Sequence, residues 1–192
     1  MVILKTANAI KKMREAGRLS ALALKVGGEA VRPGVTTAEI DKAIHDFIVS
    51  QGATPSFLNL YGFPASACIS VNDELIHGIP GNRVIKEGDI VSIDVGACLD
   101  GYHGDNAATF VAGEASEEAQ KLLDVTKQSL YKGIEMAVVG NRVGDISNAV
   151  QTYCEERGYS VVREFVGHGI GRDMHEDPNV PNFGHKGRGS KI

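Results

Sequence analysis

The sequence has 192 residues, 43% of them hydrophobic and 23% charged, which is typical of a globular protein with one sizeable core or two small ones. The net charge is −4, with both signs mixed along the chain. The sequence has no basic run of the kind that binds phosphates, so it does not favour nucleic acid as a partner. No stretch is apolar enough to span a bilayer, and charges follow a three-residue apolar start, so we predict neither a membrane span nor a signal peptide. Three cysteines without a CxxC pair favour reduced thiols in a cytoplasmic protein.

The first fifty residues predict two helices. One runs from about Asn8 to Ala30, with apolar residues on one stripe, and ends before Pro33-Gly34. Thr36 opens the second, with Glu39 three residues later as the partner in a capping box. Gly52 is suited to the left-handed conformation that ends a helix.

The stretch from Ala53 to Val111 predicts antiparallel strands, because short apolar runs there are separated by Gly and Pro. Its clearest part is a pair of β-runs, Ile90 to Ala97 and Asp105 to Val111, joined by a turn that contains Asp100-Gly101. Asp-Gly between apolar runs is a strong hairpin signal.

Asp94 and Asp105 lie on the same face of this predicted hairpin. A two- or four-residue loop centred on Asp100-Gly101 places them diagonally opposite, and a shift of one residue on each strand places them directly opposite. Two like charges on one face destabilise a hairpin unless a positive charge lies between them, so the pair predicts a metal ion. The alternative is a pair of polar residues on a half-exposed hairpin.

The second half of the chain repeats the helical pattern of the first. A helix capped by Ser116 is predicted to about Val138, and another from Asp145 to Arg157 stops at Gly158. The repeated pattern favours an internal duplication. The alternative is that the matched positions only reflect features common to all helices. The matched positions are Gly34 and Gly140, Ile40 and Ile146, Ala43 and Ala149, Ile44 and Val150, Phe47 and Tyr153, and Gly52 and Gly158.

The matched positions are 106 residues apart. With the same offset, the counterparts of Asp94 and Asp105 would fall beyond Ile192. We therefore expect the second half to lack its hairpin and the chain to be truncated at its C-terminal end.

Three histidines in glycine-containing motifs are further candidates for chemistry. His168 and His175 lie in VGHGIGRDMHEDP, and His77 lies in LIHGIP. Two aspartates and one histidine form a mixed oxygen and nitrogen ligand set suited to Mn²⁺, Fe²⁺, Co²⁺ or Zn²⁺. Each histidine alone is more often a loop or core residue than a ligand.

We assign no catalytic or binding role to several other polar residues. We assign Asp100 to the turn, and His45 and His103 to the surface. Glu176-Asp177 fits a solvated loop as well as a site. No GxSxG motif, and no cysteine with a convincing base, supports a covalent mechanism.

Three segments resemble the signature blocks of type I, bacterial methionine aminopeptidases in order and spacing: HGIP at 77–80, GDIVSIDVGACLDGYHGD at 88–105, and GHGIGRDMHEDP at 167–178. The resemblance covers essentially the whole chain. It implies an α+β pita-bread (creatinase/aminopeptidase-like) fold with an internal pseudo-twofold repeat, in which an antiparallel sheet is flanked by two helix pairs. Residues 1–192 would form a single catalytic domain whose first half ends at about residue 112 and whose second half is incomplete.

The resemblance also implies a centre of two divalent metal ions (Co, Mn, Fe or Zn). Asp94 would chelate one ion, Asp105 would bridge both, and His168 would bind the other. His175 would contact the substrate carbonyl, and His77 the nitrogen side of the scissile peptide. A pocket for the methionine side chain would be formed by Phe57, Leu60, Phe63, Cys68 and Met174.

The implied function is removal of the initiator methionine from nascent proteins by a metal-activated water. The complete enzyme would be a monomer, with the ribosome among its candidate partners and with no DNA or membrane partner. The family's two further glutamate ligands lie on C-terminal strands that this chain lacks, so we expect weak metal binding and impaired activity. Two alternatives are an Xaa-Pro metallopeptidase of the same fold and a non-catalytic peptide-binding module.

Overall fold

The computed structural model describes residues 1–192, which form two compact units that exchange short segments of sequence. The sheet unit consists of Leu4–Ser116 and Ile170–Met174. The helix-pair unit consists of Met1–Ile3, Glu117–Gly169 and His175–Ile192.

A four-stranded antiparallel sheet forms the centre of the sheet unit. Its strands are β1 (Thr54–Pro55), β2 (Ala67–Val71), β3 (Ile90–Leu99) and β4 (Tyr102–Val111). Strand β3 pairs with β4 along its whole length and with β2 and β1 as well. The predicted hairpin is confirmed.

Two residues with positive φ form the turn of this hairpin. Leu99 pairs with Tyr102, so the loop consists of Asp100 (φ 52°) and Gly101 (φ 75°) alone. Positive φ at both central residues is the geometry that matches the twist of the two strands, and it accounts for Asp-Gly at this point.

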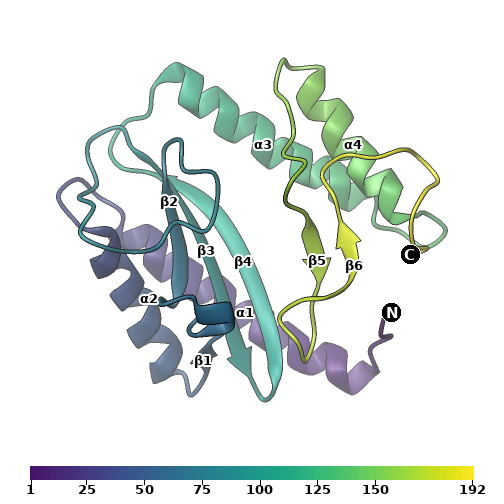
Figure 1. The fold of residues 1–192 in the computed structure, drawn as a ribbon, viewed down its shortest axis with the longest axis horizontal. Helices are drawn as coiled ribbons and strands as arrows, with labels where there is room; N and C mark the ends of the chain where they lie inside the picture. The colour runs from purple at the N-terminus through teal and green to yellow at the C-terminus, as the bar shows by residue number, and fades with distance from the viewer. The chain divides into compact units, whose positions relative to one another are not determined.

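Helices α1 (Ala7–Ala30) and α2 (Thr37–Ser50) cover one face of the sheet (Figure 1). Alternate residues of β3, namely Val91, Ile93 and Val95, are fully buried in the resulting core. The residues between them face away from the helices, because successive side chains of a strand point to opposite faces. The sheet therefore has a core face and an open face.

The predicted capping box at the start of α2 is present. The Thr36 hydroxyl accepts a hydrogen bond from the backbone N–H of Glu39 at 3.2 Å, and the Glu39 carboxylate accepts one from the backbone N–H of Thr36 at 2.7 Å. Gly52 ends the helix with φ 72°, as expected.

The prediction of strands throughout Ala53–Val111 is wrong for much of that stretch. Residues 56–66 are irregular apart from a short 3-10 helix, η1 (Leu60–Gly62), and residues 72–89 form loops. Asn59 and Tyr61 adopt positive φ (66° and 51°), which breaks the extended backbone that a strand needs. The apolar residues beside them pack into a side-chain cluster instead of pairing in a β-sheet.

The helix-pair unit contains α3 (Glu117–Met136), α4 (Val143–Glu155) and a two-stranded sheet of β5 (Gly167–Gly169) and β6 (Glu176–Val180). The two predicted helices are confirmed with small changes of boundary. The β5–β6 pair was not predicted, because each strand is short and contains Gly or Pro.

Hydrogen bonds outside the helices also repeat between the halves, which supports the predicted duplication. The backbone N–H of Gly34 donates to Ile85 O, and that of Gly140 donates to Ile192 O. Gly27 faces Ile44 between α1 and α2, and its counterpart Gly133 faces Val150 between α3 and α4.

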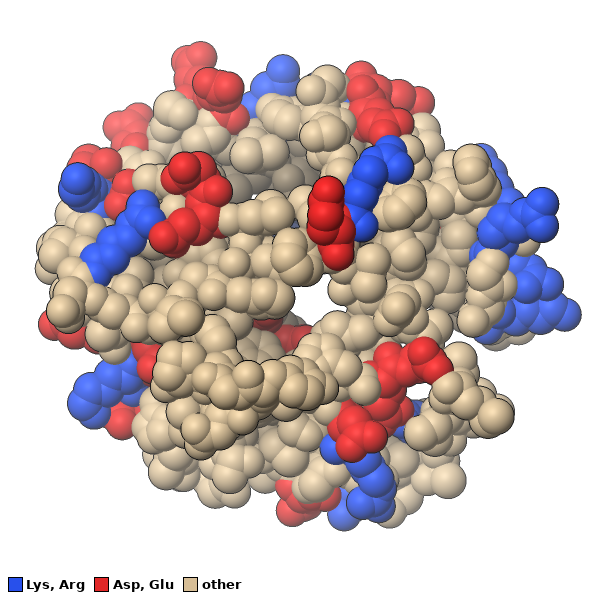
Figure 2. Space-filling model, viewed as in Figure 1, with Lys and Arg blue, Asp and Glu red and all other residues tan.

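Charge is distributed without a dominant sign. Acidic and basic side chains are interspersed with uncharged residues on the visible surface (Figure 2). None of the four α-helices has the length and apolar character to cross a membrane.

Two glycines of α1 give a test of the packing between helix and sheet. A Cβ at Gly28 would overlap the Phe110 ring, whereas one at Gly17 would meet nothing within 4 Å. We expect Gly28→Ala to lower the free energy of unfolding by about 1–3 kcal/mol. Gly17→Ala should raise it by up to about 1 kcal/mol, because alanine loses less backbone entropy in a helix. Urea denaturation of both variants checks this; equal effects would contradict the packing.

Candidate functional site

Asp94 and Asp105 lie on the open face of the sheet, as diagonal neighbours. Asp94 pairs with Ala107 and Asp105 with Gly96, so each carboxylate is displaced by two residues from the position opposite the other. This is the register predicted for a two-residue loop. Cys68 of β2 pairs directly with Asp94 and thus shares the same face.

Burial and a neighbouring charge both act on the Asp94 carboxylate. The pKa of Asp94 is raised to about 8. Burial is the largest cause of this shift, and the charge of Asp105 is the second. Burial, with the charges of both aspartates, likewise raises the pKa of the Cys68 thiol to about 12. Cys68 is therefore a neutral thiol at physiological pH, suited to lining a pocket rather than to nucleophilic attack.

The aspartate pair fits a divalent cation chemically. Two partly buried carboxylates on one face offer oxygen donors, and a cation between them would offset the repulsion that raises the Asp94 pKa. No group of three or more His, Cys, Asp or Glu side chains that could hold a metal ion is assembled in the structure. The pair thus provides part of a ligand set.

His168 has the hydrogen bond that a metal-binding histidine usually has. Its Nδ1 lies 2.8 Å from the carbonyl oxygen of Gly169. A carbonyl oxygen only accepts, so Nδ1 carries the hydrogen, and Nε2 is the nitrogen whose lone pair could bind a cation. The residue lies in β5 where the pairing with β6 is irregular, and a Cβ at Gly169 would collide with the backbone of Asp177.

His175 lies beside His168 in the helix-pair unit. Their ring centroids are 4.4 Å apart at an interplanar angle of 60°. The side chain of His175 is exposed, immediately before β6. The structure thus brings these two predicted histidines together as it brings the two aspartates together.

His77 lies in the sheet unit on an exposed loop, with φ 57°. The next residue, Gly78, donates its backbone N–H to Ser70 Oγ at 3.0 Å and accepts from the N–H of Ile69 at 2.9 Å. A Cβ on Gly78 would collide with the Ile69 carbonyl. The glycine therefore holds this histidine close to the edge of β2.

The five residues predicted to line the methionine pocket are gathered in one apolar cluster of the sheet unit. Its buried members are Phe57, Cys68 and Met174, with Leu60, Phe63 and Ile170 packed against them. Sequence reasoning missed Ile170, although it lies in the same motif as Met174.

The assignment of His45 and His103 to the surface is wrong. Both are partly buried, with Nδ1 of each 2.8 Å from a serine hydroxyl: Ser66 for His45 and Ser56 for His103. Burial lowers the pKa of His103, while the charges of Asp173 and Asp105 and a hydrogen bond to the Arg172 backbone oppose that shift. The spacing of His103 from Asp105 was the available signal, since residues two apart in a strand share a face.

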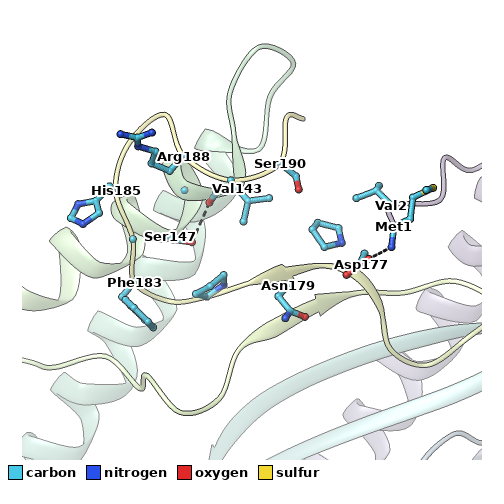
Figure 3. A pocket seen from close by; sticks show the side chains of 15 residues that line it. Met1, Val2, Val143, Ser147, Asp177, Asn179, Phe183, His185, Arg188 and Ser190 are labelled. Atoms are coloured by element: carbon cyan, nitrogen blue, oxygen red, sulfur yellow. Dashed lines mark hydrogen bonds and ion pairs between the residues drawn. The ribbon is translucent and has the colours of Figure 1, made fainter.

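A separate cavity of about 490 Å³ lies in the helix-pair unit (Figure 3). It is lined by the start of α4, by β6, by residues between Pro181 and Ser190, and by the N-terminus. The amino group of Met1 forms an ion pair there with Asp177. None of the predicted ligand or pocket residues lines it.

Comparison with known proteins shows the family. The model of metallopeptidase family M24 matches residues 11–191. A methionine aminopeptidase of Clostridium perfringens is 58% identical over 192 residues, which are the whole of this chain and 77% of that protein. The crystal structure of methionine aminopeptidase from Rickettsia prowazekii matches with a TM-score of 0.98 and 42% identity, over the whole chain and 77% of that structure.

The predicted pita-bread fold is confirmed by these matches. Prolidase from Pyrococcus furiosus has the same fold, with a TM-score of 0.85 over 95% of this chain and 53% of that structure. Its identity is only 23%, so this likeness concerns the fold alone.

The raised pKa of Asp94 predicts a pH dependence of stability without metal. In the folded protein the Asp94 carboxyl keeps its proton up to about pH 8. In the unfolded chain it loses the proton near the ordinary pKa of an aspartate, about 3.9. The folded state thus binds more protons between these values, so the free energy of unfolding falls as the pH rises, by at most about 1.4 kcal/mol per pH unit.

Urea denaturation of the chelator-treated protein across this pH window measures the slope. Asp94→Asn should flatten it, and the exposed control Asp73→Asn should leave it unchanged. An unchanged slope in Asp94→Asn would contradict the raised pKa of Asp94.

Proposed function

The chain belongs to metallopeptidase family M24, and we propose that it hydrolyses the first peptide bond of peptides and nascent proteins that begin with methionine. The observation that carries this proposal is the Asp94–Asp105 pair on the sheet face that also bears Cys68, a member of the apolar cluster. A hydrolytic centre beside a pocket for one apolar side chain is what an aminopeptidase of this specificity needs. The identity to methionine aminopeptidases supports the choice of side chain.

We propose Asp94, Asp105 and His168 as ligands of divalent metal ions, two in number, drawn from Co, Mn, Fe and Zn. The mixed oxygen and nitrogen donors and the Nδ1 hydrogen bond of His168 support this assignment. When bound, such ions lower the pKa of a water and polarise a carbonyl. Three side chains are few ligands for two ions, so we expect weak metal binding by this chain.

His175 and His77 are proposed as the residues that contact the peptide bond. An imidazole N–H of His175 would donate to the carbonyl oxygen as charge develops on it during hydrolysis. His77 would hydrogen-bond the nitrogen side of the same bond. The exposure of both side chains leaves them accessible to a substrate.

The apolar cluster is proposed to bind the methionine side chain. Phe57, Cys68 and Met174 offer flexible or polarisable contacts, which suit an unbranched thioether. Burial of such a side chain contributes about 1.5–3 kcal/mol, enough to favour methionine over small or charged first residues. The neutral Cys68 thiol adds no charge to this lining.

The cytoplasm is the proposed location, since nascent chains are made there and all three cysteines are free thiols. The ribosome is a proposed partner, and the proposed state is a monomer.

Release of methionine from Met-Ala-Ser by the 192-residue chain, with Mn²⁺ or Co²⁺ in excess, tests the function directly. We expect slow, metal-dependent release that a chelator abolishes, because three side chains hold the metal ions weakly. Asp105→Asn should lower kcat/KM by at least about a hundredfold, because removal of a charged ligand weakens the centre on which hydrolysis depends. Asp73→Asn is the matched control.

Two outcomes would overturn this assignment. Cleavage of Ala-Pro-Ala in preference to Met-Ala-Ser would favour an Xaa-Pro peptidase. Tight, metal-independent binding of Met-Ala-Ser without cleavage would favour a peptide-binding module.

Neighbouring substitutions separate chemistry from binding. His175→Ala should lower kcat about a hundredfold or more with little change in KM, because it removes a hydrogen bond that strengthens in the transition state. Met174→Ala should raise KM about tenfold with a smaller change in kcat, because it removes apolar contact made equally in both states. Steady-state kinetics at saturating metal decides, and the reverse pattern would contradict the roles given to these residues.

A further inference from the structure

We propose that His103 is a positioning residue that fixes the spacing between the two walls of the apolar cluster and so sets the specificity for the first side chain. The specificity part rests on the function proposed above, and the positioning part rests on the geometry of the sheet unit alone.

One wall of the cluster is the segment Ile170–Met174, which has no helix or strand of its own. The backbone N–H of His103 donates to the carbonyl oxygen of Gly171 at 2.9 Å. The imidazole of His103 also forms a hydrogen bond to the backbone of Arg172. Two successive peptide groups, two and three residues before Met174, are thus held by one residue of β4.

The other wall is the segment that contains Phe57. The same imidazole, through Nδ1, lies 2.8 Å from the hydroxyl of Ser56, and Ser56 donates its backbone N–H to Gly96 O at 2.9 Å. A Cβ on Gly96 would lie 2.7 Å from the Phe57 ring, so the glycine allows this wall to approach β3 closely.

His103 is therefore hydrogen-bonded to both walls at once. A backbone carbonyl only accepts, so the ring donates to Arg172, and a neutral ring can accept from the Ser56 hydroxyl. Phe57 and Met174 are 8% and 4% exposed, so a change in the spacing of their segments would alter a closely packed cluster. Phe57 and Met174 both come from irregular segments, which depend on side-chain bonds of this kind for precise placement.

Direct participation in the metal centre fits these contacts poorly. His103 lies on the open face two residues before Asp105, but its ring is engaged with Ser56 and with the backbone of Arg172. The guanidinium of Arg172, 4.9 Å above the Tyr102 ring, adds a second contact that holds the same segment against β4.

Three variants test the role. His103→Phe keeps a ring of similar size without hydrogen bonds, His103→Gln keeps one donor and one acceptor, and Ser56→Ala removes one partner only. Hydrogen–deuterium exchange reports on residues 170–174, and calorimetry gives the Kd of L-methionine and of L-norleucine without turnover.

We expect His103→Phe to speed exchange in 170–174 about tenfold, which corresponds to about 1.4 kcal/mol of local stability. It should reduce the preference for methionine over norleucine, and it should raise KM for Met-Ala-Ser more than it lowers kcat. His103→Gln should restore part of each effect. Ser56→Ala should add little in the His103→Phe background, because both changes remove the same bond.

Unchanged exchange in His103→Phe would overturn the positioning role, whatever the kinetics. Faster exchange in His103→Phe with an unchanged preference between methionine and norleucine would overturn the specificity role. Wild-type protein that binds neither amino acid would overturn it as well. A fall in kcat alone would assign His103 to the chemistry of Asp105 instead. Wild-type protein that binds methionine but releases none from Met-Ala-Ser would count against the proposed function and leave these binding results valid.

Discussion

The register of the β3–β4 hairpin is the constraint on which the rest of the sheet unit depends. The two-residue turn fixes it, and the alternation of Val91, Ile93 and Val95 into the core against α1 and α2 locks it. A slip of one residue would move those apolar side chains to the open face and carry Asp94 into the core. Burial of the apolar residues therefore stabilises a placement of two like charges that would be unfavourable by itself.

The parts of the fold that sequence could predict are those with a local physical cause. The capping box of Thr36 and Glu39, the left-handed Gly52 and the Asp-Gly turn each arise from residues within a few positions of one another. Parity placed Asp94 and Asp105 on the same face in every even-length register, and the two-residue loop on Asp100-Gly101 makes them diagonal neighbours. Their roles, and those of His168 and the pocket residues, came from resemblance of motifs.

The parts that sequence could not predict depend on contacts between distant segments. Residues 56–66 are apolar enough for strands, but positive φ at Asn59 and Tyr61 directs them into the cluster with Met174. His103 has the pattern of an exposed strand residue, and its partners, Ser56 and Gly171, are far from it in the chain. No periodicity within β4 carries that information.

The exchange of segments between the two units links their stability. A cut in the connection near Ser116 would give fragments of which neither contains a whole unit, because Ile170–Met174 follows the cut and Met1–Ile3 precedes it. The first fragment would lose Met174 and Ile170 from its apolar cluster and expose Phe57 to water. We expect units built in this way to gain and lose structure together, although each is centred on a different copy of the duplicated helix pair.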